Sequence, residues 1–275
     1  MLSPDLTCLA AFSFCRVNQP CIRERDKSGS CLDKKTSKRK PSSAVVVVKS
    51  MVEADMISNP IKEKIELKVG MVCIGTALCL TFIHFARYST SSQLGHLAFW
   101  ASQSFFFYFI LPALVVKLVF KQNLADYGFK LKGSLKNWPL YLGMFAFMLP
   151  VIYICSKTAN FQSHYPFYRL SWGESWYPNL LIWEGFYLLQ FIGLEFFFRG
   201  FMVHGLKDKM GIHAVLVMVI PYCMIHFGKP FPECLGSIIA GLILGYLSYK
   251  NNSVMLGIAI HYAVAITMDL CALWA

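Results

Sequence analysis

One apolar run in the chain, residues 187–203, carries a carboxylate and a guanidinium four residues apart. These are Glu195 and Arg199, and most of the residues around them are aromatic or aliphatic. A run of this length and polarity predicts a membrane-spanning helix. A charged side chain near the middle of such a helix costs about 2.5–3.5 kcal/mol on insertion scales, so two of them in one helix require an explanation.

The spacing of the pair allows two explanations. Residues four apart lie on the same face of a helix, and Glu before Arg is the favourable order, so the two charges can neutralise each other. In one interpretation Arg199 extends to the cytosolic interface and Glu195 only accompanies it. In the other, the pair belongs to a polar site inside the bilayer. The sequence favours the second, because ionisable groups within membrane helices generally mark function.

The composition is typical of a membrane protein. Of the 275 residues, 56 % are hydrophobic and only 15 % are charged, which is too apolar for a soluble domain. The formal net charge of +11 does not indicate a nucleic-acid partner, because much of it lies in the N-terminal segment and in loops predicted to face the cytosol. We predict two parts: a polar, basic segment at residues 1–66, interpreted as a disordered tail or a presequence, and a transmembrane domain at residues 67–275.

Hydropathy divides the second part into seven predicted spans, so the expected fold class is all-α, a polytopic bundle of transmembrane helices. The spans cover roughly residues 67–86, 97–120, 138–155, 180–203, 214–225, 235–249 and 254–274. Lysines concentrate in alternate connecting segments, at 121–136, 207–209 and 250. By the positive-inside rule, this distribution places the N-terminus in the cytosol and the C-terminus on the opposite side.

Two further patterns concern packing and the membrane interface. Small residues recur at every fourth position at Ser237, Gly241 and Gly245, which predicts the close approach of another helix. The connecting segment 156–179 is rich in Tyr, Phe and Trp. We expect these aromatic side chains to form a belt at the membrane interface.

Three of the late spans each present a Glu or a His. Besides Glu195, His226 ends the predicted fifth span, with Tyr222 one turn earlier, and His261 lies in the last span. A lone histidine in a helix is usually structural, but these three groups could converge on one cavity within the bilayer. They suit water activation, with the carboxylate as base, one imidazole holding the water and the other stabilising the oxyanion. Two His and a carboxylate could also bind zinc, and the sequence leaves this open.

These residues form three motifs in chain order. The motifs are Glu195-x-x-x-Arg199-Gly200, Tyr222-x-x-x-His226 and Gly257-x-x-x-His261. They resemble the motifs of the CPBP family, intramembrane proteases named for CAAX processing and bacteriocin processing and also called the Abi family. The resemblance covers residues 180–275, and the segment 124–129 weakly echoes a further part of the family pattern. It implies that Glu195 activates water, Arg199 holds Glu195, His226 positions the water and His261 stabilises the oxyanion.

The chain departs from the family pattern at two positions. The first motif usually begins with two successive glutamates, and here the first of these positions is Leu194. An asparagine usually follows the last histidine by four residues, and here this residue is Ala265. Either Glu195 takes over as the base, or a variant site uses Asp269. The latter residue can only flank the site, because it lies about 80° around the helix from His261.

The sequence thus predicts an integral, multi-pass protein of a bacterial inner membrane or a eukaryotic organelle membrane. The predicted function is an intramembrane endopeptidase of CPBP type that hydrolyses a membrane-bound protein or peptide. The alternative is a catalytically inactive homologue that acts as a membrane scaffold or chaperone, which Leu194 and Ala265 favour. A small transporter would also use buried Glu, His and Arg, but the chain has no evident inverted repeat of the broken-helix kind.

Overall fold

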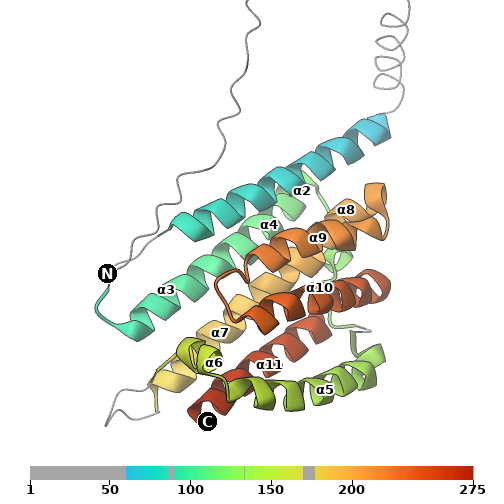
Figure 1. Cartoon of the computed structure of the whole chain (residues 1–275). Coiled ribbons are helices and arrows are strands. Elements are labelled where there is room, and N and C mark those ends of the chain that lie inside the picture. Colours follow the sequence, from blue (N-terminus) through green and yellow to red (C-terminus); the bar gives the residue numbers. More distant parts are fainter. Residues whose placement is uncertain (1–59, 87–89, 133, 170–176, 275) are drawn as a thin grey trace, which may run out of the picture. The chain divides into compact units, whose positions relative to one another are not determined.

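The computed structural model describes residues 60–86, 90–132, 134–169 and 177–274 (Figure 1). All regular elements within these residues are helices, which confirms the predicted all-α fold class. The chain divides into two units, residues 1–53 and 54–275, and the described residues all belong to the second. The predicted N-terminal segment lies almost entirely outside the described residues, so its boundary at residue 66 stays a prediction.

Six helices in the described part are long and apolar enough to cross a membrane, since about 20 residues span a hydrocarbon core. They are α2 (Pro60–Phe85), α3 (Gln93–Phe105) continued by α4 (Leu111–Leu114), α5 (Trp138–Ser156), α7 (Asn179–Glu195) continued by α8 (Val203–Met210), α10 (Phe231–Asn251) and α11 (Met255–Leu273). A short helix, α6 (Ala159–His164), follows α5. The protein is therefore an integral, multi-pass membrane protein.

The fifth predicted span differs from the others. It corresponds to α9 (His213–Met224), which has 12 residues and is about 18 Å long, shorter than a hydrocarbon core of about 30 Å. The helices nevertheless alternate in direction along the chain, as the loop charges predict (Figure 1). Tyr222 near the end of α9 contacts Gly241 in the middle of α10, and the turn after α9 lies beside the start of α10, where Cys234 Sγ donates to the carbonyl of His226 at 2.8 Å.

The helix formed by α7 and α8 is the most buried span of the described bundle. Half of its most apolar window is buried, against 17–33 % for the other five spans. A π-helical turn, Phe196–Met202, joins the two halves. Three successive residues, Phe196, Phe197 and Phe198, are all fully buried, so the helix is surrounded on every side. A helix in this position must be apolar all round, which explains the run of aromatic residues.

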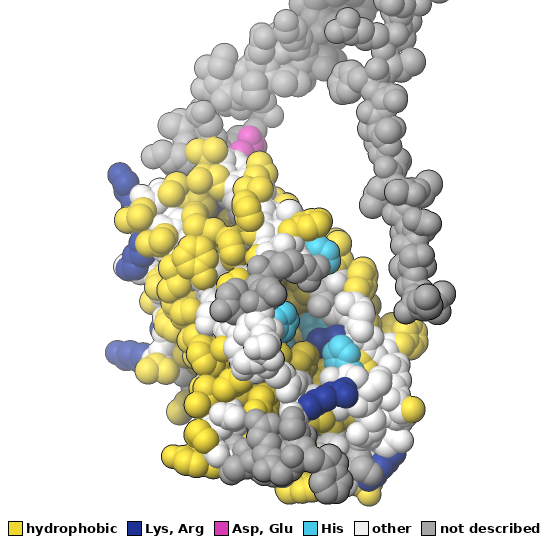
Figure 2. Space-filling model, turned by 90° about the vertical axis from the view of Figure 1, so that its left-hand side faces the viewer, with side chains coloured by type: hydrophobic (Ala, Val, Ile, Leu, Met, Phe, Trp, Pro, Cys, Tyr) yellow, Lys and Arg dark blue, Asp and Glu magenta, His cyan; other side chains and the backbone are white. Residues whose placement is uncertain are grey.

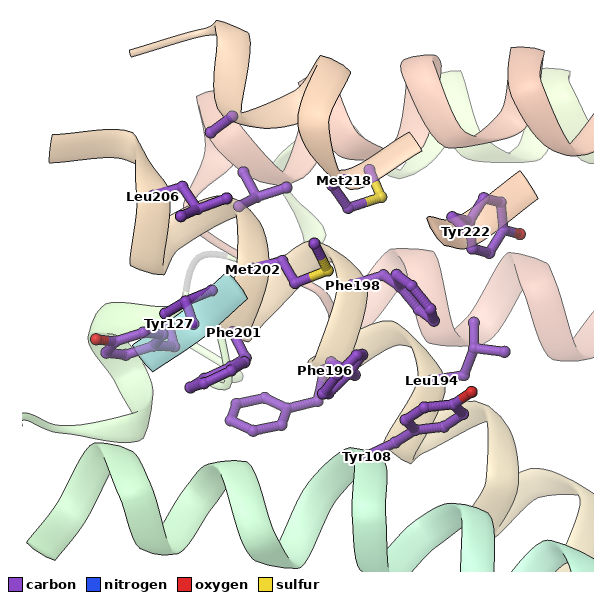
Figure 3. Close-up of a cluster of buried hydrophobic side chains, with 14 of the residues drawn as sticks. Tyr108, Tyr127, Leu194, Phe196, Phe198, Phe201, Met202, Leu206, Met218 and Tyr222 are labelled. Atoms are coloured by element: carbon purple, nitrogen blue, oxygen red, sulfur yellow. The ribbon is translucent and has the colours of Figure 1, made fainter. Parts of the chain in front are cut away.

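Two ring contacts fix this helix between its neighbours. The ring of Phe197 lies 4.8 Å from that of Tyr108, which belongs to the segment between α3 and α4. The ring of Phe198 lies 5.3 Å from that of Tyr222 on α9 (Figure 3). Successive side chains therefore contact different helices, and a rotation of the central helix would disrupt both contacts.

Small residues allow the predicted close approach of α10. A Cβ atom at Gly241 would lie 3.0 Å from the Tyr222 ring, and one at Gly245 would lie 2.7 Å from Met218. Both contacts are with α9, so the repeat of small residues packs α10 directly against that helix. This packing brings the turn that carries His226 against the bundle interior.

The segment 124–129 ties the central helix to the start of α11. It forms a tight turn that ends at Gly128, whose φ of 81° lies in the left-handed region that favours glycine. The carbonyl of Gly128 accepts the N–H of Val254 at 3.0 Å. The carbonyl of Tyr127 would lie only 2.8 Å from a Cβ atom at Gly200. This close approach explains why a glycine follows Arg199.

The prediction of an interfacial aromatic belt in segment 156–179 is wrong for two of its residues. Tyr165 and Tyr168 are only 1 % and 3 % exposed and pack into the bundle. They are buried because Tyr168 packs in a cluster with Trp183 of α7, and Tyr165 packs with Phe161 of α6 and Ala272 of α11. Tyr177 is exposed, and Trp172 and Trp176 lie outside the described residues.

Candidate active site

Glu195 and Arg199 form an ion pair inside the bundle. Nη1 of Arg199 lies 3.3 Å from Oε1 of Glu195, and both side chains are fully buried. The interpretation in which Arg199 extends to the membrane interface is therefore excluded. Glu195 is the last residue of α7, and Arg199 lies in the π-helical turn that follows. Such wide turns are frequent at functional sites.

The guanidinium of Arg199 also rests on an aromatic ring. Its central carbon lies 3.7 Å from the centre of the Tyr222 ring, which is a close cation–π contact. Among the described residues, none accepts a hydrogen bond from its nitrogens. The Glu195 carboxylate and the Tyr222 ring therefore provide the main compensation for burying this charge. The carbonyl of Arg199 accepts the hydroxyl of Ser248 at 3.0 Å, which anchors the turn to α10.

His261 contacts the same carboxylate from α11. Its Nδ1 lies 2.7 Å from Oε1 of Glu195, the oxygen that also faces Arg199. The side chain of His261 is 17 % exposed, whereas that of Glu195 is fully buried. Because a carboxylate only accepts hydrogen bonds, Nδ1 donates, and Nε2 of the neutral ring is left as an acceptor.

Gly257 makes room for the carboxylate. A Cβ atom at this position would lie 2.7 Å from Oε2 of Glu195, well inside van der Waals contact. Oε2 has no hydrogen-bond partner among the described residues. The position of the carboxylate therefore depends on its other oxygen, which Arg199 and His261 share, and on the absence of a side chain at residue 257.

His226 follows the end of α9 and is held by its own turn. Its Nδ1 lies 2.8 Å from the carbonyl oxygen of Tyr222, so Nδ1 donates and Nε2 of the neutral ring is again an acceptor. Its ring packs edge-on against the Tyr222 ring with the centroids 4.8 Å apart, and the His261 ring centroid lies 6.3 Å from that of Tyr222. Tyr222, which the sequence marked only as a neighbour of His226, thus contacts Arg199 and both histidines.

A cavity of about 1370 Å³ adjoins these residues. His226 and His261 line it, and Glu195 and Arg199 do not. Leu194, the apolar residue that precedes Glu195, also lines the wall. Figure 2 shows histidine side chains together with Lys or Arg side chains in a hollow of this face. Of the four predicted site residues, His226 and His261 therefore face the cavity, and Glu195 and Arg199 lie behind them.

A second polar group lines the cavity and was not identified from the sequence. It consists of Lys229, Glu233 and Tyr165, which are joined by hydrogen bonds. The only signal in the sequence is a Lys and a Glu four residues apart at the start of α10. Charged residues at the end of an apolar helix are common, so this signal is weak.

Two further polar residues, Asp269 of α11 and Glu184 of α7, have hydrogen-bond partners elsewhere in the bundle. Oδ1 of Asp269 accepts the N–H of Phe167 at 3.1 Å and so fixes the segment after α6. The hydroxyl of Tyr262 donates to the carbonyl oxygen of Glu184 at 3.0 Å. Asp269 therefore serves the connecting segment, in agreement with its position to the side of His261.

The part of the chain that the structure describes contains no cluster of metal-ligating side chains. No three His, Cys, Asp or Glu side chains there lie together in an arrangement that could hold a metal ion. The zinc that the sequence left open stays an untested prediction. The chemistry proposed below uses the chain's own side chains.

In a comparison with known families, residues 176–267 match the family model described as type II CAAX prenyl endopeptidase, Rce1-like. The matched segment includes Glu195, Arg199, His226 and His261, and it confirms the resemblance to CAAX-processing proteases. No curated protein and no solved structure matches the chain.

Proposed function

We propose that this membrane protein, whose residues 176–267 are Rce1-like, is an intramembrane endopeptidase in which His261 activates water and Glu195 holds His261. The observation that carries the proposal is the 2.7 Å contact between Nδ1 of His261 and Oε1 of Glu195 at the cavity wall. It joins a fully buried carboxylate to an imidazole that is partly open to the cavity.

These roles differ from those that the resemblance implies. Glu195 was expected to act on water directly, but its carboxylate does not line the cavity, whereas His261 does. A carboxylate paired with an imidazole holds the ring in one orientation and stabilises the imidazolium that forms when the ring takes a proton. In this proposal Nε2 of His261 is the general base, and Glu195 is a positioning residue.

His226 provides the second contact to the water. Both histidines offer Nε2 as an acceptor in their neutral forms, and a water between them can donate one hydrogen to each. His261 then takes one proton, and the hydroxide attacks the carbonyl carbon of the scissile peptide bond. The imidazolium returns this proton to the leaving nitrogen as the C–N bond breaks, so that the ring ends the cycle neutral.

The cavity supports a membrane-bound, prenylated peptide as the substrate class. Much of its wall is apolar, and α5 and α10 contribute a large part of it. The lining residues include Met144, Phe147, Met148, Ile239 and Ile243. A cavity of this size with a few polar groups suits a hydrocarbon chain attached to a polar segment. This agrees with the description of the matched family as prenyl endopeptidases.

The test is hydrolysis of a farnesylated tetrapeptide by the purified protein in lipid nanodiscs. The wild type should release the C-terminal tripeptide, and both His261→Ala and Glu195→Gln should lower kcat by roughly 100-fold or more. The control is His213→Ala, because His213 is exposed at the start of α9 and does not line the cavity. Full hydrolysis by a folded His261→Ala variant would refute the mechanism.

One observation favours the scaffold as a second candidate function. Leu194 presents an apolar side chain to the cavity beside the two histidines, and the carboxylate of Glu195 lies behind them. A scaffold predicts that the wild type binds the farnesylated peptide and returns it intact. It also predicts that His261→Ala leaves the binding unchanged.

A further inference from the structure

The polar group formed by Lys229, Glu233 and Tyr165 is open to the cavity. Nζ of Lys229 lies 2.6 Å from Oε1 of Glu233 and 3.3 Å from the hydroxyl of Tyr165. That hydroxyl donates to the other carboxylate oxygen of Glu233 at 2.7 Å. The side chains of Lys229 and Glu233 are 25 % and 19 % exposed, whereas the Glu195–Arg199 pair is fully buried.

The ammonium of Lys229 is fixed but not saturated. It has three N–H donors, and two acceptors contact it among the described residues. The rings of Tyr165 and Phe167 lie within 5.9 Å and 5.6 Å of Nζ and shield it from other directions. One donor is therefore left for a ligand, on an ammonium whose position is already determined.

Lys229 also lies close to His226. Its backbone N–H donates to the carbonyl of His226 at 3.1 Å, so it lies in the same tight turn. Lys229, His226 and His261 line the same cavity. Of the side chains that line the cavity in the described part of the chain, Lys229 is the only Lys or Arg.

The cavity wall combines polar and apolar residues. Lys229 and Glu233 belong to its polar part, while residues of α5 and α10 such as Phe147 and Ile243 supply hydrocarbon. Such a wall fits an amphipathic ligand, with its apolar chain along α5 and α10 and an anionic group at Lys229. Because Glu233 already neutralises part of the ammonium charge, the anion gains one hydrogen bond and not a full unpaired charge.

We infer that Lys229 binds the C-terminal carboxylate of the peptide substrate, with Glu233 and Tyr165 holding its ammonium in place. The identity of the ligand as a peptide rests on the proposed function. Lys229 is then a specificity residue: it selects a free carboxylate close to the scissile bond. It sets which bond reaches the histidines and takes no part in proton transfer.

The experiment compares two farnesylated tetrapeptides that differ only in ending with a carboxylate or a carboxamide. Their dissociation constants are measured in nanodiscs through tryptophan fluorescence, since Trp100 lines the cavity. A His261→Ala background keeps the peptides intact under the proposed function. We expect this background to bind the acid roughly tenfold or more tightly than the amide, the usual effect of one hydrogen bond to a charged group.

Adding Lys229→Met should remove this preference by weakening the acid to the level of the amide. The single variant leaves Glu233 without its ammonium partner. The double variant Lys229→Met, Glu233→Gln is therefore tested in parallel and should also lose the preference for the acid. The control is Lys157→Met, an exposed lysine after α5 that lies outside the cavity, and it should keep the preference. A retained preference in both Lys229 variants would overturn the inference.

The assay separates this inference from the proposed function. An acid preference that depends on Lys229, together with no hydrolysis by the wild type, would support the carboxylate site and defeat the endopeptidase. If hydrolysis occurs and Lys229→Met lowers kcat equally for acid and amide with unchanged dissociation constants, Lys229 acts on the transition state and the inference fails. Failure of the His261→Ala background to bind either peptide would overturn it as well.

Discussion

Two ion pairs in this protein have the same spacing and different surroundings. Glu195 and Arg199 lie four residues apart inside the central helix, and Lys229 and Glu233 lie four residues apart where α10 begins. The first pair is fully buried behind the cavity wall, and the second is partly exposed in that wall. Burial, and not spacing, therefore separates the pair that can only position other groups from the pair that can reach a ligand.

The order of the charges differs as well. Glu before Arg is the favourable order on a helix, and the first pair follows it inside the bundle, where desolvation is most expensive. In the second pair Lys229 lies in the turn before α10, outside the helix, and a tyrosine hydroxyl holds the pair in addition. We expect these two pairs to respond very differently to the loss of one partner.

The largest effect should come from Arg199→Met. This change removes the cation and leaves the Glu195 carboxylate buried, which should cost about 3–5 kcal/mol of folding stability. The measurement is the free energy of unfolding in mixed micelles, with expression level in parallel. The protein should also lose hydrolysis, because the carboxylate no longer keeps its place against His261.

The matched control for this change removes both charges. Glu195→Gln combined with Arg199→Met leaves no unpaired ion and should recover most of the lost stability, but not the hydrolysis. If Arg199→Met alone unfolds as readily as wild type, the pair is less buried than the structure has it. The contrast with the second pair would then disappear.

Sequence reasoning identified the first pair because its chemistry conflicts with its surroundings. A Glu and an Arg in an aromatic run are conspicuous, and the histidines at the end of α9 and in α11 follow a recognisable spacing. The helices themselves were predictable from hydropathy, except that α9 is too short to span alone. It packs closely against Gly241 and Gly245 of α10, a tertiary contact that hydropathy does not measure.

The second pair escaped detection for the opposite reason. Lys229 and Glu233 flank an apolar helix, where charged residues are expected, and their partner Tyr165 comes from a distant segment that looked interfacial. The wide π-helical turn at Phe196–Met202 was not predictable either, since no proline marks it. The residue types of the site could be predicted from the sequence, but the sequence did not show that His226 and His261 line the cavity while Glu195 and Arg199 lie behind them.

A smaller effect should follow from Gly257→Ala, which tests how the buried carboxylate of Glu195 is held in place. The new methyl group would meet Oε2 of Glu195 at 2.7 Å, so the carboxylate must move away from His261. We expect about 1–3 kcal/mol of destabilisation from overpacking. We also expect a loss of kcat larger than the loss of stability explains. The measurements are melting temperature in detergent and hydrolysis of the farnesylated peptide.

The control for this variant is Gly185→Ala in α7, where an added methyl group meets no atom within 4 Å. It should keep both stability and hydrolysis and could stabilise the helix slightly, since alanine is a better helix former. Equal activity of the two alanine variants would show that the carboxylate does not need its position against His261. His261 would then have to act without Glu195.

The smallest effect on stability should come from Lys229→Met, which tests the ligand-facing side. Its partner Glu233 keeps the tyrosine hydroxyl and access to the cavity, so the loss should be about 1 kcal/mol or less, as for pairs near solvent. A double-mutant cycle with Glu233→Gln measures the coupling directly through the free energies of unfolding. The same cycle on Glu195 and Arg199 should give a coupling several times larger, because water cannot replace either partner there.

If the two couplings are equal, the second pair is a structural element like the first, and its position in the cavity wall gives no reason to assign it a ligand. A small coupling in the second pair, combined with loss of the acid preference in Lys229→Met, places its role in binding, since removing it would change recognition far more than folding.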